Sequence, residues 1–162
     1  MGCDIHLYKE KFVKNKWQFI EEIDGNRDYD TFSLLCGVRN YYRPTPITKS
    51  TSVPSDLSNK VLNIYENWES DAHTFCILTK KDLDNYKDWN TPFIDTRTPK
   101  PIDPLETKFG GISDFEEKYH NTKIDPELYN SVTPTNILKD SGYDILFKEL
   151  KDNERLIFWF DN

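Results

Sequence analysis

The sequence lacks most of the short motifs that assign a protein to a class at once. It contains no Cys-x-x-Cys zinc pattern, no glycine-rich phosphate loop with its Lys and Ser/Thr, and no Gly-x-Ser-x-Gly nucleophile elbow. No apolar run reaches membrane-spanning length, and the N-terminus has neither the charged nor the apolar region of a secretion signal. We therefore expect no membrane contact and a cytoplasmic location.

Cysteine is also scarce, with three residues in the chain. The number is odd, and all three residues, Cys3, Cys36 and Cys76, lie in apolar surroundings. This pattern predicts reduced thiols that are buried in the core, and it indicates a reducing compartment.

Positive charge is in short supply as well. The formal net charge is −7, so the sequence indicates no general affinity for duplex nucleic acid, although one basic pocket can still exist. What the chain does have is aromatic side chains, which make up 14% of its 162 residues and suffice to build one core. We expect a single domain that spans residues 1–162.

Hydrophobic periodicity predicts an α+β fold. Residues 2–13 alternate in polarity and, with residues 17–22, predict an N-terminal β-hairpin, whereas residues 155–160 are apolar on both faces and predict a central strand. The expected sheet is mainly antiparallel or mixed, with helices packed on it, and residues 89–112 are expected to form a long irregular loop. A further strand is predicted over residues 74–78. Five helices are also predicted: one ends at Gly37, one begins after Ser55, one begins at the Thr79/Asp82 capping box, one begins at Ser113, and one spans residues 143–151.

Two Asp-x-His pairs are the main chemical signal. Asp4 and His6 lie on the first predicted strand and share one face, and Asp71 and His73 precede another strand. If the pairs meet, their carboxylates and imidazoles could hold a divalent metal. Alternatively, the histidines could serve as general base and general acid at a phosphodiester, because imidazole titrates near neutral pH. The plainer interpretation is a set of ordinary hydrogen-bonded residues.

A second group of residues predicts an anion site. Arg27 and Tyr29 lead into a predicted helix, and Arg39 and Asn40 follow it. A guanidinium fork suits phosphate oxygens, and a helix N-terminus favours anions. A helix cap with surface salt bridges would explain the same residues without a ligand.

The motifs together resemble a family of small uncharacterised bacteriophage proteins that begin with the same six residues, Met-Gly-Cys-Asp-Ile-His. The resemblance covers about residues 1–85 and rests on that start, Arg27-Asp28-Tyr29-Asp30-Thr31-Phe32, Gly37-Val38-Arg39-Asn40, Pro54-Ser55-Asp56-Leu57-Ser58, and His73-Thr74 with Leu78-Thr79. It implies an accessory protein that acts against host defence in the host cytoplasm, and its shared polar positions are those singled out above.

Three functions follow as expectations. The first is a hydrolase that cleaves a phosphodiester in a small nucleotide such as a cyclic-dinucleotide-like immune signal, with or without a metal. The second is a nucleotide-binding sponge, which would suit a homo-oligomer. The third is a phage protein that binds a protein partner.

Overall fold

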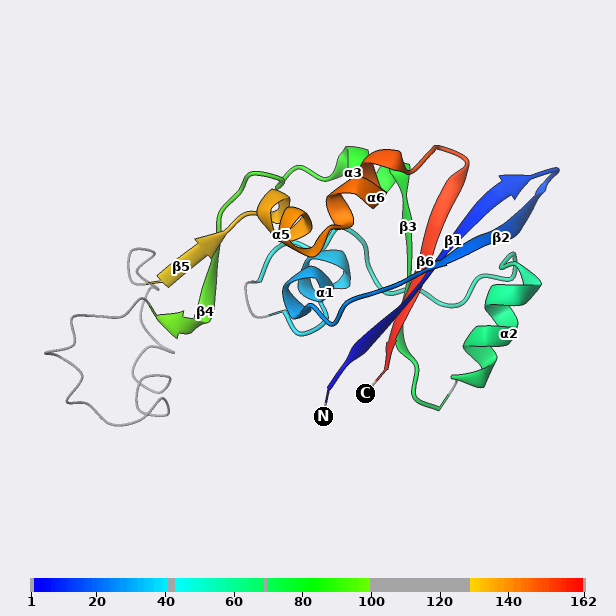
Figure 1. The fold of residues 1–162 in the computed structure, drawn as a ribbon, viewed down its shortest axis with the longest axis horizontal. Coiled ribbons are helices and arrows are strands. Elements are labelled where there is room, and N and C mark those ends of the chain that lie inside the picture. The colour runs from blue at the N-terminus through cyan, green and yellow to red at the C-terminus, as the bar shows by residue number, and fades with distance from the viewer. Residues whose placement is uncertain (1, 41–42, 69, 100–128, 162) are drawn as a thin grey trace, which may run out of the picture.

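A four-stranded antiparallel sheet forms the centre of the protein. The structure, a computed structural model, describes residues 2–40, 43–68, 70–99 and 129–161. The C-terminal strand is central in the sheet, as the sequence predicted, and it lies between the first strand and the third (Figure 1). The order is β2 (Lys16–Ile23), β1 (Asp4–Val13), β6 (Glu154–Asp161) and β3 (His73–Thr79).

Strands β1 and β2 form the predicted hairpin. The alternation in β1 is confirmed, and its turn falls at Lys14 and Asn15, whose φ angles of 51° and 63° suit the tight turn of a two-residue hairpin. Strand β6 is buried from Glu154 to Phe160, in keeping with its central position.

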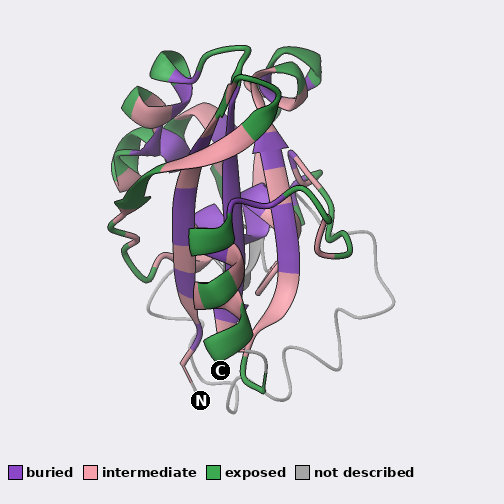
Figure 2. Ribbon diagram, turned by 90° about the vertical axis from the view of Figure 1, so that its right-hand side faces the viewer, coloured by how far each residue is buried: buried purple, intermediate pink, exposed green. Residues whose placement is uncertain are grey.

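Helices cover both faces of this sheet (Figures 1 and 2). On one face α2 packs over a core that includes Tyr8, Val61 and Trp159, and it turns its exposed residues to solvent (in front in Figure 2). On the other face the remaining described helices pack over a larger core that includes Leu7 and Phe160. The helices are α1 (Tyr29–Cys36), α2 (Asn59–Asn67), α3 (Lys80–Asn85), α5 (Pro134–Ser141) and α6 (Tyr143–Glu149).

Local capping signals fixed several helix ends. Gly37 ends α1 in the left-handed conformation at φ 76°, and Thr79 and Asp82 form the predicted capping box of α3. The predicted cap of α2 was wrong, because Ser58 rather than Ser55 accepts the hydrogen bond from Val61 N–H. Helix α2 therefore begins three residues later than the sequence predicted.

The expected irregular loop at 89–112 is wrong in part. Residues Phe93–Pro99 form β4, which pairs with β5 (Tyr129–Val132) in a two-stranded antiparallel sheet. The remainder of that loop, and the helix expected from Ser113, lie outside the described residues. Helix α5 was not anticipated from the sequence.

The cysteines also differ from expectation. Cys36 at the end of α1 and Cys76 in β3 form a disulfide, and among the described residues Cys3 is the free, buried thiol. The prediction of reduced thiols is therefore wrong for Cys36 and Cys76. The cysteines consequently give no support to the predicted reducing compartment. The sequence hid this pair because its members are 40 residues apart and meet only in the fold.

Within the ranges that the structure describes, no helix has both the length and the apolar composition needed to span a membrane.

Candidate functional site

The end of the sheet where β1 begins and β6 finishes gathers most of the predicted site. We call Asp4, His6, Arg27 and Asp161 the strand-end cluster. Asp161 lies opposite Asp4 in the β1–β6 register, and its Oδ1 accepts the Asp4 backbone N–H at 3.0 Å. Its Oδ2 lies 3.0 Å from Nε2 of His6. One carboxylate therefore fixes both the strand end and the imidazole.

His6 is held on three sides. Asp161 fixes its Nε2, and its ring lies 4.4 Å from that of Trp68 and 5.7 Å from that of Trp159, centroid to centroid. The side chains of His6 and Asp161 keep 18% and 16% of their surface exposed, so both remain within reach of solvent. A neutral His6 that donates Nε2–H to Asp161 presents Nδ1 as a proton acceptor.

Arg27 and Asp4 form a two-bonded ion pair beside this dyad. Nε and Nη2 of Arg27 donate to the two carboxylate oxygens of Asp4, each at 2.6 Å. The bonds from Arg27 hold the pKa of Asp4 below its usual range and raise that of Arg27. Gly2 makes room for the guanidinium, since a Cβ there would lie 2.3 Å from Nη1 of Arg27.

Tyr29 and Arg39, two of the residues expected to bind a ligand, lie next to the start of β1. The Tyr29 hydroxyl accepts the backbone N–H of Cys3 at 3.3 Å, and the Arg39 guanidinium lies 5.7 Å from the centre of the Tyr29 ring. Burial raises the pKa of the Cys3 thiol, and the charge of Arg39 opposes that rise. Two arginines therefore flank the first residues of β1.

Asn40, which was also expected to bind a ligand, instead contacts its own loop. Its Nδ2 donates to the carbonyl of Pro44 at 3.3 Å, and its Oδ1 is buried without a hydrogen-bond partner in the structure.

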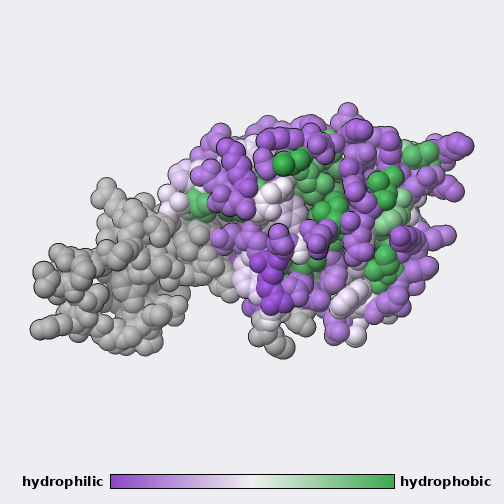
Figure 3. All heavy atoms as spheres, in the orientation of Figure 1, coloured by the Kyte–Doolittle hydropathy of each residue, from purple (hydrophilic) through white to green (hydrophobic). Residues whose placement is uncertain are grey.

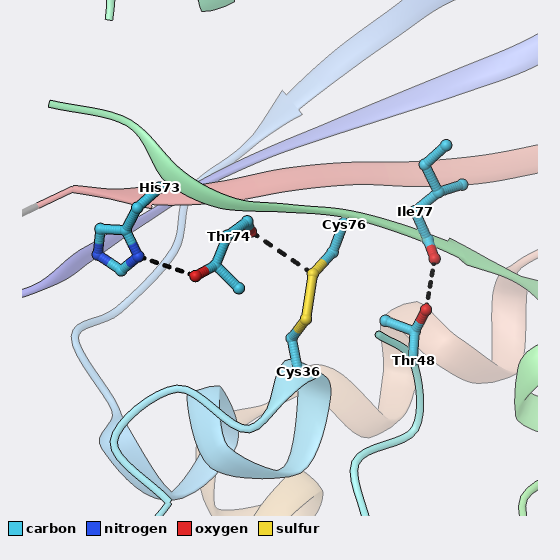
Figure 4. The surroundings of a disulfide bond; sticks show 6 residues. All are labelled: Cys36, Thr48, His73, Thr74, Cys76 and Ile77. Atoms are coloured by element: carbon cyan, nitrogen blue, oxygen red, sulfur yellow. Dashed lines mark hydrogen bonds between the residues drawn. A yellow bond between two sulfur atoms is a disulfide. The ribbon is translucent and has the colours of Figure 1, made fainter. Parts of the chain in front are cut away.

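His73 lies on the opposite face of the sheet from His6. His6 is opposite Trp159 in the register and His73 is opposite Phe160, and successive residues of a strand point to opposite faces. The Nε2 of His73 lies 3.9 Å from the buried Cys3 sulfur, while its Nδ1 is 2.9 Å from Oγ1 of Thr74, next to the disulfide (Figure 4). The histidines therefore do not face one another.

Asp71 lies on the exposed turn between α2 and β3, so the second Asp-x-His pair is only half on a strand. Among the described residues no group of three or more His, Cys, Asp or Glu side chains is arranged to hold a metal ion. Asp4, His6, Asp71 and His73 thus do not form the metal site that their spacing suggested.

Sequence reasoning missed Asp161 and the aromatic walls around His6. Asp161 is 155 residues from His6 and carries no motif of its own. The one available signal was the expected central position of the final strand, which brings its polar end beside β1. Trp68, which contacts the His6 ring, also packs against the α2-side core.

Comparisons with known proteins add no family, since no family model, no curated protein and no solved structure matches this chain.

Proposed function

We propose that the strand-end cluster binds a phosphate of a small nucleotide and that His6 transfers the proton when a phosphodiester is hydrolysed. The observation that carries the proposal is the His6–Asp161 dyad, with its 3.0 Å contact, beside the pair that Asp4 of β1 forms with Arg27 from the segment between β2 and α1. A base held by a carboxylate and an adjacent guanidinium are the parts that such a reaction needs.

Arg27 supplies the first contact to the phosphate. Asp4 occupies Nε and Nη2, so the N–H groups on Nη1 can still donate to a ligand oxygen. Because Arg27 and Asp4 expose 51% and 48% of their side chains, an anion reaches the pair without a rearrangement of the core. Tyr29 accepts from Cys3, which leaves its own O–H available as a donor.

His6 supplies the proton transfer. With Nε2–H directed at Asp161, Nδ1 accepts a proton from the attacking water or ribose 2′-hydroxyl as its oxygen bonds to phosphorus, and Asp161 stabilises the imidazolium. The P–O bond to the leaving group breaks, and the leaving oxygen takes a proton from solvent. This assigns the base to one histidine, because His73 faces the other side of the sheet. The substrate that the phage resemblance implies is a cyclic-dinucleotide-like immune signal in the host cytoplasm.

A non-catalytic sponge is the second candidate, and the separation of the histidines favours it. A phosphodiester cleavage commonly uses a base and an acid on the two sides of the phosphate. The His6 face holds only one histidine of the expected pair, so the same residues could retain a nucleotide without turning it over.

The test incubates the protein with a panel of linear and cyclic nucleotides, with and without EDTA. Mass spectrometry then follows both the supernatant and any ligand released by heat. A new product supports hydrolysis, and EDTA sensitivity would add a metal to the scheme. An intact nucleotide recovered only after heating supports the sponge. If no compound is consumed and none is retained by the protein, both candidates are overturned.

A further inference from the structure

A second candidate site lies at the opposite end of the β1–β2 hairpin, far along the strands from His6. A cavity of about 460 Å³ opens there between the hairpin and the start of α2, and we call it the hairpin cavity. Its volume falls in the range of small-molecule sites, roughly 300–1,000 Å³. Its walls include three aromatic rings and two lysines, namely Phe12, Trp17, Phe19, Lys16 and Lys60.

The charge around the hairpin cavity opposes that of the whole protein. The net charge is −7, yet the ten residues from Lys11 to Ile20 contain three lysines and no acidic residue. Lys60 adds a cation from α2 across the cavity. The acidic residue in the lining, Asp56, is already paired, because Nη1 of Arg155 donates to its Oδ1 at 3.1 Å. The cavity therefore attracts anions.

The aromatic rings offer a stacking surface. Phe12 exposes 42% of its surface, which is unusual for a phenylalanine, and its ring lies 5.2 Å from that of Trp17. One side of Trp17 is covered by Arg155 at 4.1 Å, and Lys60 Nζ lies 3.7 Å from the Phe19 centroid. On the face in Figure 3, exposed apolar residues stand in patches among hydrophilic ones.

Buried hydrogen bonds connect the elements that form the walls of the hairpin cavity. The Glu10 side chain is fully buried and accepts both the Ser58 backbone N–H, at 2.9 Å, and Arg155 Nε, at 2.8 Å. These bonds join β1, β6 and the first residue before α2, and thereby link the hairpin side of the cavity to its α2 side.

We propose that the hairpin cavity binds single-stranded nucleic acid. One base stacks on Phe12, and the adjoining phosphates contact Lys16 and Lys60. Lys14, exposed in the turn of the hairpin, continues the positive charge beyond the cavity, so the path of charge is longer than one free nucleotide. A duplex does not fit the chemistry, because its base faces are already stacked inside the helix. The site is separate from the strand-end cluster and does not depend on the proposed hydrolysis.

The test measures fluorescence anisotropy of labelled oligothymidylate and oligouridylate strands titrated with the full chain. Phe12→Ala should weaken binding about tenfold, as expected for loss of one stacked base. Lys16→Glu/Lys60→Glu should weaken it further, and wild-type affinity should fall as salt rises. The matched control is Lys81→Glu/Lys151→Glu, which makes the same charge change at exposed positions outside the cavity lining.

Thermal unfolding of each variant checks that the fold persists, and His6→Gln should bind the strand like wild type. Retained binding in the control, with loss in the cavity variants, supports the proposal. Absence of strand binding by the wild type would overturn it. So would equal weakening in the control, equal affinity for a duplex, or competition by a mononucleotide at the same concentration as the strand. Loss of binding in His6→Gln would instead place the strand at the other end of the sheet.

Discussion

The two ends of the β1–β6 pair carry the same kind of ion pair in different surroundings. At the hairpin end Arg155 and Glu10 are opposite one another in the register, 2.8 Å apart, and expose 6% and 0% of their side chains. At the strand end Arg27 and Asp4 are 2.6 Å apart and expose 51% and 48%. The two pairs are alike in charge and distance and differ in burial. The buried Arg155–Glu10 pair therefore stabilises the fold, whereas the exposed Arg27–Asp4 pair is accessible to a ligand.

The difference follows from the cost of removing charge from water. A buried pair forms only if every bond is satisfied, and Glu10 accordingly also accepts the Ser58 N–H. An exposed pair contributes little stability, because water competes for both partners.

Arg155→Met should destabilise the protein by about 3–5 kcal/mol, because it leaves the buried Glu10 carboxylate without its cation. Urea unfolding followed by circular dichroism measures the change. The matched control is Arg27→Met, which removes the same side chain from the exposed pair and should cost clearly less. Equal losses in the two variants would contradict the contrast between the ends.

Removing the disulfide with Cys36→Ser/Cys76→Ser should cost about 2–4 kcal/mol, because the unfolded chain gains freedom. The disulfide joins the end of α1 to β3, and α1 follows Arg27. Hydrogen exchange should therefore rise more in residues 27–39 than in residues 10–19. Uniform acceleration would show that the two ends are not independently supported.

Gly2→Ala should leave stability nearly unchanged but weaken nucleotide binding at the strand end. The new Cβ would lie 2.3 Å from Nη1 of Arg27, and this flexible guanidinium can move aside. We expect about a tenfold weaker Kd, equivalent to one lost charge-assisted hydrogen bond. Calorimetric titration of the nucleotide found in the panel measures it, and binding to single strands at the hairpin cavity should not change.

Asp4→Asn should lower stability slightly at neutral pH and leave it nearly unchanged in acid. The folded pKa of Asp4 is lowered by Arg27, so its stabilisation is present above the ordinary pKa of Asp and is lost as pH falls through the lower folded value. The Tm difference between wild type and variant should therefore shrink as the solution becomes acidic. The effect is small because the pair is exposed, and a difference that grew on acidification would have the wrong sign.

The parts of this structure that the sequence predicted are those with a local cause. Alternation over residues 2–13 gave β1, Gly37 ended α1, and Thr79 with Asp82 began α3. The apolar run at the C-terminus correctly indicated a central strand.

The parts that it missed depend on register between distant segments. Glu10 and Arg155 are 145 residues apart, and neither carries a motif. The opposite directions of His6 and His73 follow from a shift of one residue along β6, which hydrophobic patterns cannot show. The residues expected at the site were mostly brought to one end of the sheet, whereas their division between its faces emerged only in the fold.

The most direct test of the central claim compares His6→Gln with His73→Gln in the nucleotide panel, with thermal unfolding to confirm that both variants are folded. If His6 alone transfers the proton, turnover should fall roughly 100-fold in His6→Gln and stay near wild type in His73→Gln. Full turnover in His6→Gln, or equal loss in both variants, would contradict the assignment of the chemistry to the His6 face of the sheet.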